Sequence, residues 1–311
     1  MWWSFSIYTA FPRGYCAWVH RAVDMLMQVI MTYPKETIYV NHEIIHNTFV
    51  IHMFERKWVI FESDIEKIPE GWLIVISAHG TGPSYFKNLR SRNIRWIDAT
   101  CPLVEKVHRE AKDYIGRWYH ILYIGKKWHQ EALGMLDEWS GHITLIEKEE
   151  DLKSLNHTHI KFVLLTQTTL SVDDTKKLIE KIQALIPDVV LPKTDDICYA
   201  TTNRQNAVKA LAEKCELIVV IGSKSSSNSN KLRDVAESLW KRAYLIDDAS
   251  EIDTEWLKWI STIGVTAWAS GPEELVAWVI EHLQTLGWRF ERELRVVEEK
   301  ITFPYILKIQ S

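Results

Sequence analysis

The feature that most constrains this chain is a pattern that occurs three times, each time beginning with a cysteine. Cys16, Cys101 and Cys198 each follow a turn-like stretch and open a segment with the apolar spacing of a helix. From 26 to 28 residues further on, each is followed by an apolar strand with a polar end, at His42, at His129 with Glu131, and at Ser226. A second strand of this kind then ends at His79, Thr168 and Ser270. The sequence therefore predicts three similar units.

Strands in these units alternate with helices, and the strand cores are continuously apolar rather than alternating. This pattern is typical of α/β proteins whose parallel sheets are covered on both faces. Ligands in such folds bind at the carboxyl ends of the strands, which is where the polar groups stand. We expect three units, at residues 1–98, 99–195 and 196–285, followed by a C-terminal arm at 286–311.

Bulk properties exclude several classes of protein. The net charge is −4 and no basic tract occurs, so neither nucleic acid nor an anionic membrane surface is expected as a partner. No apolar run approaches 18 residues, and the N-terminus does not resemble a secretory signal. Four cysteines in 311 residues do not suggest a disulfide framework, so we expect reduced thiols in a cytosol-like compartment. Cys215 has no counterpart in the other units and is interpreted as a buried structural cysteine.

Three converging thiolates favour a metal cluster over structural zinc. Zinc prefers four closed ligands, often in close pairs, whereas Cys16, Cys101 and Cys198 are 85 and 97 residues apart. A [4Fe–4S] cluster normally takes four thiolates, so three would leave one iron open to a substrate. The alternative is that the three cysteines are unrelated and merely buried.

The polar strand ends form a donor-rich set suited to phosphate oxygens. It comprises His42, His79, His129, Thr168, Ser226, Ser227, Asn228 and Ser270. Helix N-termini at the same edge would favour an anion there. Glu131 is the carboxylate of this set and suits a proton donor, although a plain helix N-terminal Glu would look the same.

Several long motifs resemble one family, that of 4-hydroxy-3-methylbut-2-enyl diphosphate reductase. They are PRGYC, YVNHEIIHN, SAHG, DATCPLV, TQTTLSVDDT, DDICYATTNRQNAV and GSKSSSNSNKL, and the resemblance extends to about residue 285. It implies a trefoil of three α/β units around a [4Fe–4S] cluster. It also implies an iron–sulfur oxidoreductase that removes the substrate's hydroxyl to give isopentenyl and dimethylallyl diphosphates, the last step of the non-mevalonate isoprenoid pathway.

The resemblance also implies roles for individual residues. Cys16, Cys101 and Cys198 would ligate the cluster, with the open iron on the substrate's hydroxyl. Glu131 would supply the proton, with Thr168 as a relay and His129 beside them. The diphosphate would be held by His42, His79, His129, Thr168, Ser226, Ser227, Asn228 and Ser270. Ferredoxin or flavodoxin would bring electrons, in the cytoplasm or, as a second choice, in a plastid stroma.

Tryptophan is the anomaly of this sequence, with 15 residues against 12 glycines. Trp18, Trp128 and Trp268 stand where the family usually has Gly, so the alternative is a catalytically impaired homologue that still binds diphosphate. A zinc hydrolase built on the histidines and Glu131 is a third hypothesis, which leaves the repeated cysteines unexplained. More generally, Trp at turn positions should strain the backbone, and we expect this at Trp18, Trp58, Trp118 and Trp288.

Overall fold

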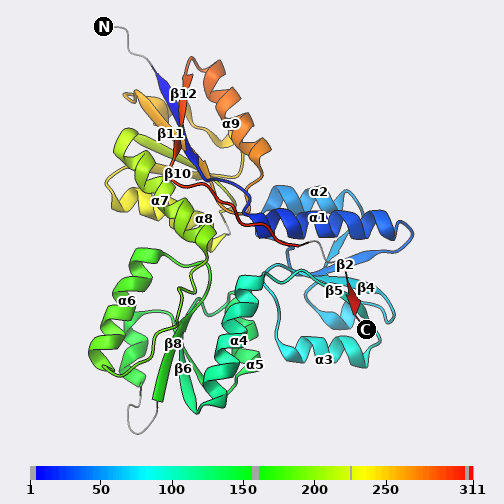
Figure 1. Cartoon of the computed structure of the whole chain (residues 1–311). Coiled ribbons are helices and arrows are strands. Elements are labelled where there is room, and N and C mark those ends of the chain that lie inside the picture. The colour runs from blue at the N-terminus through cyan, green and yellow to red at the C-terminus, as the bar shows by residue number, and fades with distance from the viewer. Residues whose placement is uncertain (1–4, 156–160, 225, 305–307, 311) are drawn as a thin grey trace. The chain divides into compact units, whose positions relative to one another are not determined.

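The computed structural model describes residues 5–155, 161–224, 226–304 and 308–310, apart from the side chains of Ser154, Ser227 and Asn228. The chain divides into two compact units, and Figure 1 labels many of their helices and strands. Unit 1 comprises Met1–Arg21, Ile45–His52 and Tyr199–Pro304, and unit 2 comprises Ala22–Ile44, Met53–Cys198 and Tyr305–Ser311. The division passes through helices α1 (Ala17–Thr32) and α2 (Thr48–Glu55).

Unit 1 is built on a sheet of parallel strands in the order β10-β9-β11-β1-β12. Its elements are β1 (Ser6–Phe11), α7 (Tyr199–Lys214), β9 (Leu217–Ile221), α8 (Ser227–Ser238), β10 (Arg242–Ile246), η3 (Ala249–Glu251), η4 (Thr254–Leu257), β11 (Thr262–Ala267), α9 (Glu273–Thr285) and β12 (Arg289–Arg295). The apolar strands β9 and β11 form one core with the buried face of α9. Gly264 of β11 packs closely against α7 and Cys215, since a Cβ at Gly264 would lie 3.2 Å from Leu211 and 3.3 Å from the Cys215 sulfur. Cys215 is therefore a buried structural residue, and burial raises the pKa of its thiol to about 12.

Unit 2 contains two further sheets, in the orders β13-β5-β4-β2-β3 and β7-β6-β8. The first sheet is formed by β2 (Ile38–Asn41), β3 (Ile60–Phe61), β4 (Leu73–Ile76), β5 (Arg95–Asp98) and β13 (Ile309–Gln310). The second is formed by β6 (Tyr119–Ile124), β7 (Ile143–Ile146) and β8 (Lys161–Thr166). The helices are η1 (Ile65–Lys67), α3 (Pro83–Ser91), α4 (Pro102–Gly116), α5 (Gln130–Glu138), η2 (Glu149–Ser154) and α6 (Val172–Leu185). Every pairing is parallel except that of β13 with β5.

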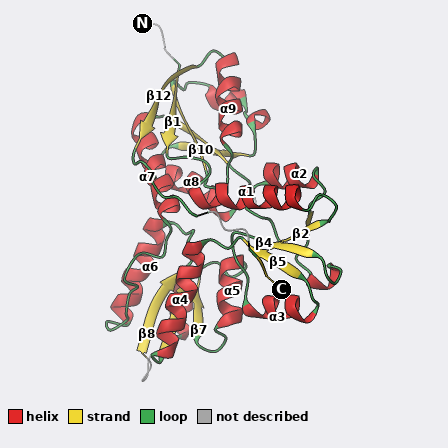
Figure 2. Ribbon diagram, turned by 45° about the vertical axis from the view of Figure 1, so that its right-hand side comes forward, coloured by secondary structure: helices red, strands yellow, loops and turns green. Residues whose placement is uncertain are grey.

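Strand β6 explains why the sequence reads as continuously apolar. Leu122 and Ile124 belong to a core that α6 closes, whereas Ile121 and Tyr123 belong to a core closed by α4 and α5. Successive side chains point to opposite faces of a strand, so a sheet covered on both faces has apolar residues at every position. Figure 2 shows α6 and α4 on opposite sides of β8.

The predicted α/β class with mostly parallel strands is confirmed, and among the described residues these strands form three sheets. The unit boundaries near residues 98, 195 and 285 stay a prediction. One pairing departs from a simple three-unit division, because β1 lies between β11 and β12 rather than beside β2. None of the helices in the described ranges has the length and apolar character needed to cross a membrane.

Among the tryptophans that the structure describes, four adopt a left-handed backbone, the region that favours glycine. Trp58, Trp118, Trp240 and Trp259 have φ between 61° and 65°, and their exposed fractions run from 86% to 97%. Each follows the end of a helix, where Gly is the usual residue. The expected strain is thus confirmed at Trp58 and Trp118.

At the other two positions the expectation was wrong. Trp18 lies inside the first turn of α1, where the backbone is ordinary helix. Trp288 is buried, and Gly287, at φ 94°, adopts the left-handed conformation in its place. In this turn the left-handed residue is therefore one position before the tryptophan.

Replacing any of the four strained tryptophans by Gly should stabilise the protein. A left-handed conformation costs a residue with a Cβ about 1–2 kcal/mol, and Gly removes this cost. The greater conformational freedom of Gly in the unfolded chain offsets part of that stabilisation. The exposed indoles bury little that would be lost. We expect Trp58→Gly, Trp118→Gly, Trp240→Gly and Trp259→Gly each to raise the free energy of unfolding by about 0.5–1 kcal/mol in urea titrations.

Trp128→Gly is the matched control, because Trp128 is 77% exposed but has no positive φ. It should give no gain in the free energy of unfolding. An equal gain at Trp128 would show that exposure of the indole, rather than backbone strain, is responsible.

Candidate functional site

The three repeated cysteines share one structural position. Each stands immediately before a helix, at the start of α1, α4 and α7, and Cys101 is the N-cap of α4. Each donates its backbone N–H to a carbonyl on a loop that follows a strand. The acceptors are Ala269 for Cys16 at 3.2 Å, Ala78 for Cys101 at 3.0 Å and Thr168 for Cys198 at 2.8 Å.

The acceptors also correspond, because each lies two residues beyond the end of its strand: β11 ends at Ala267, β4 at Ile76 and β8 at Thr166. The structure thus brings out a repeat that the sequence indicated, with one correction of register. Thr168 corresponds to Ala78 and Ala269, and not to His79 and Ser270, which are one residue further on.

The N-terminus of a helix is a favourable place for a thiolate, because peptide N–H groups point toward it. At Cys16 this interaction is direct, since the N–H of Val19 donates to Sγ at 3.4 Å. Burial raises the pKa of the Cys16 thiol, while the charge of Arg204 lowers it and that of Glu299 raises it.

The segment before Cys198 is anchored at Asp196. This carboxylate accepts the N–H of Thr166 at 2.9 Å and the ammonium of Lys106 at 3.1 Å. Lys106 also donates to the carbonyls of Thr194 and Asp195. Burial raises the pKa of Asp196 to about 6, against the lowering effect of the Thr166 N–H and of Lys106. The approach to Cys198 is therefore fixed from both the Cys101 helix and strand β8.

Glu131 and Thr168 form the most closely connected pair of the predicted site. Both are buried, with Glu131 only 3% exposed. Thr168 donates its backbone N–H to Oε2 of Glu131 at 2.9 Å, and its hydroxyl lies 3.0 and 2.9 Å from Oε1 and Oε2. Because the Thr168 carbonyl accepts from Cys198, this threonine links the candidate proton donor to a candidate cluster ligand.

His129 is the N-cap of α5, and its Nδ1 accepts the N–H of Glu131 at 3.3 Å. A neutral ring held this way carries its proton on Nε2, which suits a donor to an anion. The ring of His79 lies edge-on to that of His129, with 5.7 Å between centroids. Two of the three predicted histidines are therefore neighbours.

His42 stands directly after β2 with a φ of 55°, and its Nδ1 lies 2.7 Å from the hydroxyl of Ser63. Strand β2 pairs with β4, and Oδ1 of Asn41 accepts the N–H of Ser77 at 2.6 Å, which joins the two strand ends. His42 and His79 therefore extend from adjacent strands of one sheet. A non-glycine residue held in this sparsely populated conformation often marks a functional position.

The remaining predicted residues belong to unit 1. Ser226 is the buried N-cap of α8, and its hydroxyl accepts the N–H of Ser229 at 3.3 Å. Ser270 donates to the carbonyl of His46 at 2.8 Å. The side chains of Ser227 and Asn228 lie outside the described residues. Within the described ranges no three His, Cys, Asp or Glu side chains gather closely enough to hold a metal ion.

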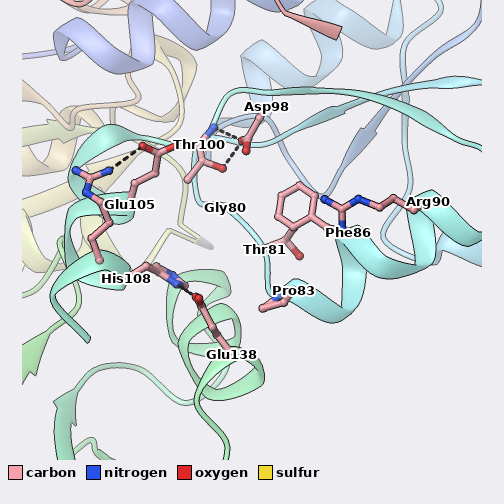
Figure 3. A pocket seen from close by; sticks show the side chains of 11 residues that line it. Gly80, Thr81, Pro83, Phe86, Arg90, Asp98, Thr100, Glu105, His108 and Glu138 are labelled. Atoms are coloured by element: carbon pink, nitrogen blue, oxygen red, sulfur yellow. Dashed lines mark hydrogen bonds and ion pairs between the residues drawn. The ribbon is translucent and has the colours of Figure 1, made fainter. Parts of the chain in front are cut away.

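A cavity of about 410 Å3 adjoins two of the predicted positions, since it is lined by Gly80 and Thr100, the neighbours of His79 and Cys101 (Figure 3). Thr100 donates its N–H to the carboxylate of Asp98 at 2.9 Å, and His108 pairs with Glu138. Sequence reasoning missed these contacts. The spacing D-x-T before Cys101 is the signal that would have indicated the Asp98–Thr100 turn.

The three tryptophans at family glycine positions have ordinary backbones, because none of them has a positive φ. Trp18 stacks edge-on against Phe303 at 4.9 Å, Trp128 is exposed, and Trp268 is part of the buried core. The structure therefore gives no support to the impaired homologue.

Known proteins resemble this chain over nearly its whole length. A family model described as LytB protein matches residues 7–284. The 4-hydroxy-3-methylbut-2-enyl diphosphate reductase of Acinetobacter baylyi is 41% identical and covers 98% of both chains. That of Cutibacterium acnes is 44% identical over 96% of this chain and 93% of its own.

Solved structures give the same answer. The structure of E-1-hydroxy-2-methyl-but-2-enyl-4-diphosphate reductase from Plasmodium falciparum matches with a TM-score of 0.94 and 32% identity, over 98% of this chain and 96% of that one. A structure of (E)-4-hydroxy-3-methyl-but-2-enyl diphosphate reductase matches with a TM-score of 0.65 and 29% identity, over 90% and 99% of the chains. Together with the motifs around the three cysteines, these matches show that the chain belongs to the LytB family.

Proposed function

We propose that this protein reduces (E)-4-hydroxy-3-methylbut-2-enyl diphosphate to isopentenyl and dimethylallyl diphosphates, the last step of the non-mevalonate pathway. Two electrons and two protons enter, the C–O bond breaks, and the hydroxyl leaves as water. The observation that carries the proposal is that Cys16, Cys101 and Cys198 occupy equivalent positions, each before a helix and bonded to a loop after a strand. The chain is also related over nearly its whole length to reductases of this name.

We further propose that these three cysteines hold a [4Fe–4S] cluster with one open iron. The donor set fits, since it consists of three thiols at helix N-termini, where peptide dipoles stabilise thiolates. When bound, the cluster would supply electrons one at a time and a Lewis-acidic iron for the hydroxyl oxygen. Ferredoxin or flavodoxin is the expected electron donor, and the cytoplasm the expected compartment.

Glu131 is proposed as the residue that holds the proton for the departing hydroxyl. The Thr168 hydroxyl stands at nearly equal distance from both carboxylate oxygens, so it can donate to either one. The other oxygen is then available to carry the proton. The backbone N–H of Thr168 keeps the carboxylate in one orientation whichever oxygen accepts from the Thr168 hydroxyl.

The diphosphate is assigned to the donors at the strand and helix ends, namely His42, His79, His129, Thr168, Ser226, Ser227, Asn228 and Ser270. Imidazole, hydroxyl and amide donors together with helix N-termini suit a multiply charged anion. No observation favours either of the other two hypotheses. The impaired homologue lacks the expected strain at its tryptophans, and a zinc hydrolase leaves the equivalent cysteines unexplained.

Protein purified without oxygen should contain roughly equal amounts of iron and acid-labile sulfide, approaching about four of each per chain. Cys101→Ser should lose most of both, because one thiolate of the set is gone. Cys215→Ala is the matched control and should retain both, since Cys215 is packed in the core of unit 1. Equal loss in the two variants would argue against the assigned ligand set.

Glu131→Gln should lower kcat by about 10²–10⁴-fold, the usual contribution of a positioned proton donor, while iron and sulfide content stay unchanged. Turnover is measured with a reduced one-electron donor and the diphosphate substrate. Glu138→Gln, in the same helix but paired with His108, should keep its turnover. If Glu131→Gln kept wild-type turnover, Glu131 would not be the residue that supplies the proton.

His42→Gly should separate backbone strain from binding. Gly accepts a φ of 55° without penalty, so the free energy of unfolding should stay within about 1 kcal/mol of wild type despite the lost contact with Ser63. Affinity for the diphosphate should fall about 10-fold or more, because one hydrogen bond to a charged group is lost.

Asn93→Gly is the control for this variant, since exposed Asn93 has a similar φ of 52° at the end of α3. It should show the backbone effect with unchanged affinity, measured by calorimetry. A His42→Gly variant that binds the substrate as tightly as wild type would place His42 outside the diphosphate site.

A further inference from the structure

Arg204, on α7, is a fully buried cation that the proposed reaction does not use. Its side chain is 0% exposed, and its Nε donates to the carbonyl of Gly14 at 2.9 Å. Nη1 donates to the carbonyl of Ala200 at 3.0 Å and to Oε1 of Glu299 at 3.0 Å, and Nη2 lies 3.4 Å from Oε2. Burying an ion costs free energy unless the ion is paired. The four contacts of the Arg204 guanidinium therefore indicate a specific role.

The partner carboxylate comes from the segment that follows β12 and lies outside the residues matched by the family model. Glu299 also accepts from the amide of Asn203 at 3.0 Å. Four residues later, Phe303 packs its ring against Trp18 in the first turn of α1. Figure 1 shows this red segment running to the N-terminal end of α1. The segment 296–304 is therefore fastened at two points beside Cys16.

Gly14, whose carbonyl Arg204 holds, lies two residues before Cys16. The loop is tight, because Gly14 has a φ of 64° and a Cβ there would lie 2.9 Å from the carbonyl oxygen of Gly271. A comparable anchor precedes Cys198, where Lys106 of the Cys101 helix holds Asp196, again two residues before the cysteine. In both cases a cation from one cysteine helix fixes the approach to another cysteine.

The two charges also act with opposite signs on any negative charge at the Cys16 end of this loop. Arg204 donates to the Gly14 carbonyl, two residues before Cys16, and Glu299 faces Arg204 at 3.0 Å. Reduction of any group bound there adds negative charge, so Arg204 favours the reduced state and Glu299 disfavours it. Arg204 is 0% exposed and Glu299 15% exposed, so solvent screens both effects only weakly.

We propose that Arg204 and Glu299 are a positioning charge pair that holds the Cys16 loop and sets the reduction potential of the cluster bound by Cys16. The proposal rests on the proposed function, in which Cys16 is a cluster ligand. Its distinctive consequence is that a carboxylate in the C-terminal arm holds the potential lower than Arg204 alone would allow.

The test is a redox titration of anaerobically purified protein, followed by electron paramagnetic resonance. Glu299→Gln keeps the shape and the hydrogen-bonding oxygen but removes the charge. We expect it to favour the reduced state about 10-fold, a positive shift of about 59 mV for a one-electron couple. Glu298→Gln is the matched control. It makes the same change in net charge one residue away, on a side chain that is 69% exposed and paired with Lys300, and should leave the potential unchanged.

A third variant separates charge from packing. Phe303→Ala removes the contact with Trp18 without changing any charge, so its potential should stay near that of wild type. A shift as large as that of Glu299→Gln would show that packing of the arm, and not the charge pair, sets the potential, and the proposal would fail.

The proposal would also fail if Glu299→Gln did not shift the potential, or if Glu298→Gln shifted it equally. A wild-type chain that bound no cluster would overturn this proposal together with the proposed function. If the wild-type chain bound the cluster but Glu299→Gln left its reduction potential unchanged, this proposal alone would be overturned. Because Arg204 is fully buried, its own variants risk misfolding, and the two glutamate variants decide the question without them.

Discussion

One hydrogen bond, made three times, determines how this protein presents its cysteines. The backbone N–H of each repeated cysteine donates to a carbonyl two residues past the end of a strand, at Ala269, Ala78 and Thr168. The bond fixes the start of a helix against the carboxyl end of a parallel strand. Because peptide N–H groups are exposed at that helix end, each thiol is placed where a thiolate is electrostatically favoured. The placement of the three thiols therefore depends on backbone geometry before any other side chain is considered.

Strain in the chain is distributed in two different ways. At Trp58, Trp118, Trp240 and Trp259 it lies on the exposed surface, where the indoles bury little. At His42 the same backbone region is occupied beside Ser63, at a strand end next to His79. Only the second kind places a polar side chain at the edge of the sheet where ligands bind in α/β folds.

Local patterns were sufficient to predict the class of the fold and the helix N-termini. Continuous apolar strands indicated sheets covered on both faces, and the three repeated cysteines were expected to open helices, as they do at α1, α4 and α7. Long-range pairings were not predictable, because nothing near β1 in the sequence indicates that it lies between β11 and β12. The one-residue error at Thr168 has a similar cause, since the end of a strand is decided by its partners. Arg204 and Glu299, 95 residues apart, could be paired only in three dimensions.

The anchors before the cysteines suggest why the site uses buried charges at all. Lys106 fixes the approach to Cys198, and Arg204 fixes the approach to Cys16. A neutral donor could hold the same carbonyls, at a smaller cost of desolvation. A cation adds a field that favours electrons arriving nearby, and its carboxylate partner limits that field. Asp196 faces Lys106 as Glu299 faces Arg204, so each of these two approaches to a cysteine is held by one pair of opposite charges. Such fixed loops are compatible with the role proposed for the cysteines, in which the sulfurs stay in place while the charge near them changes.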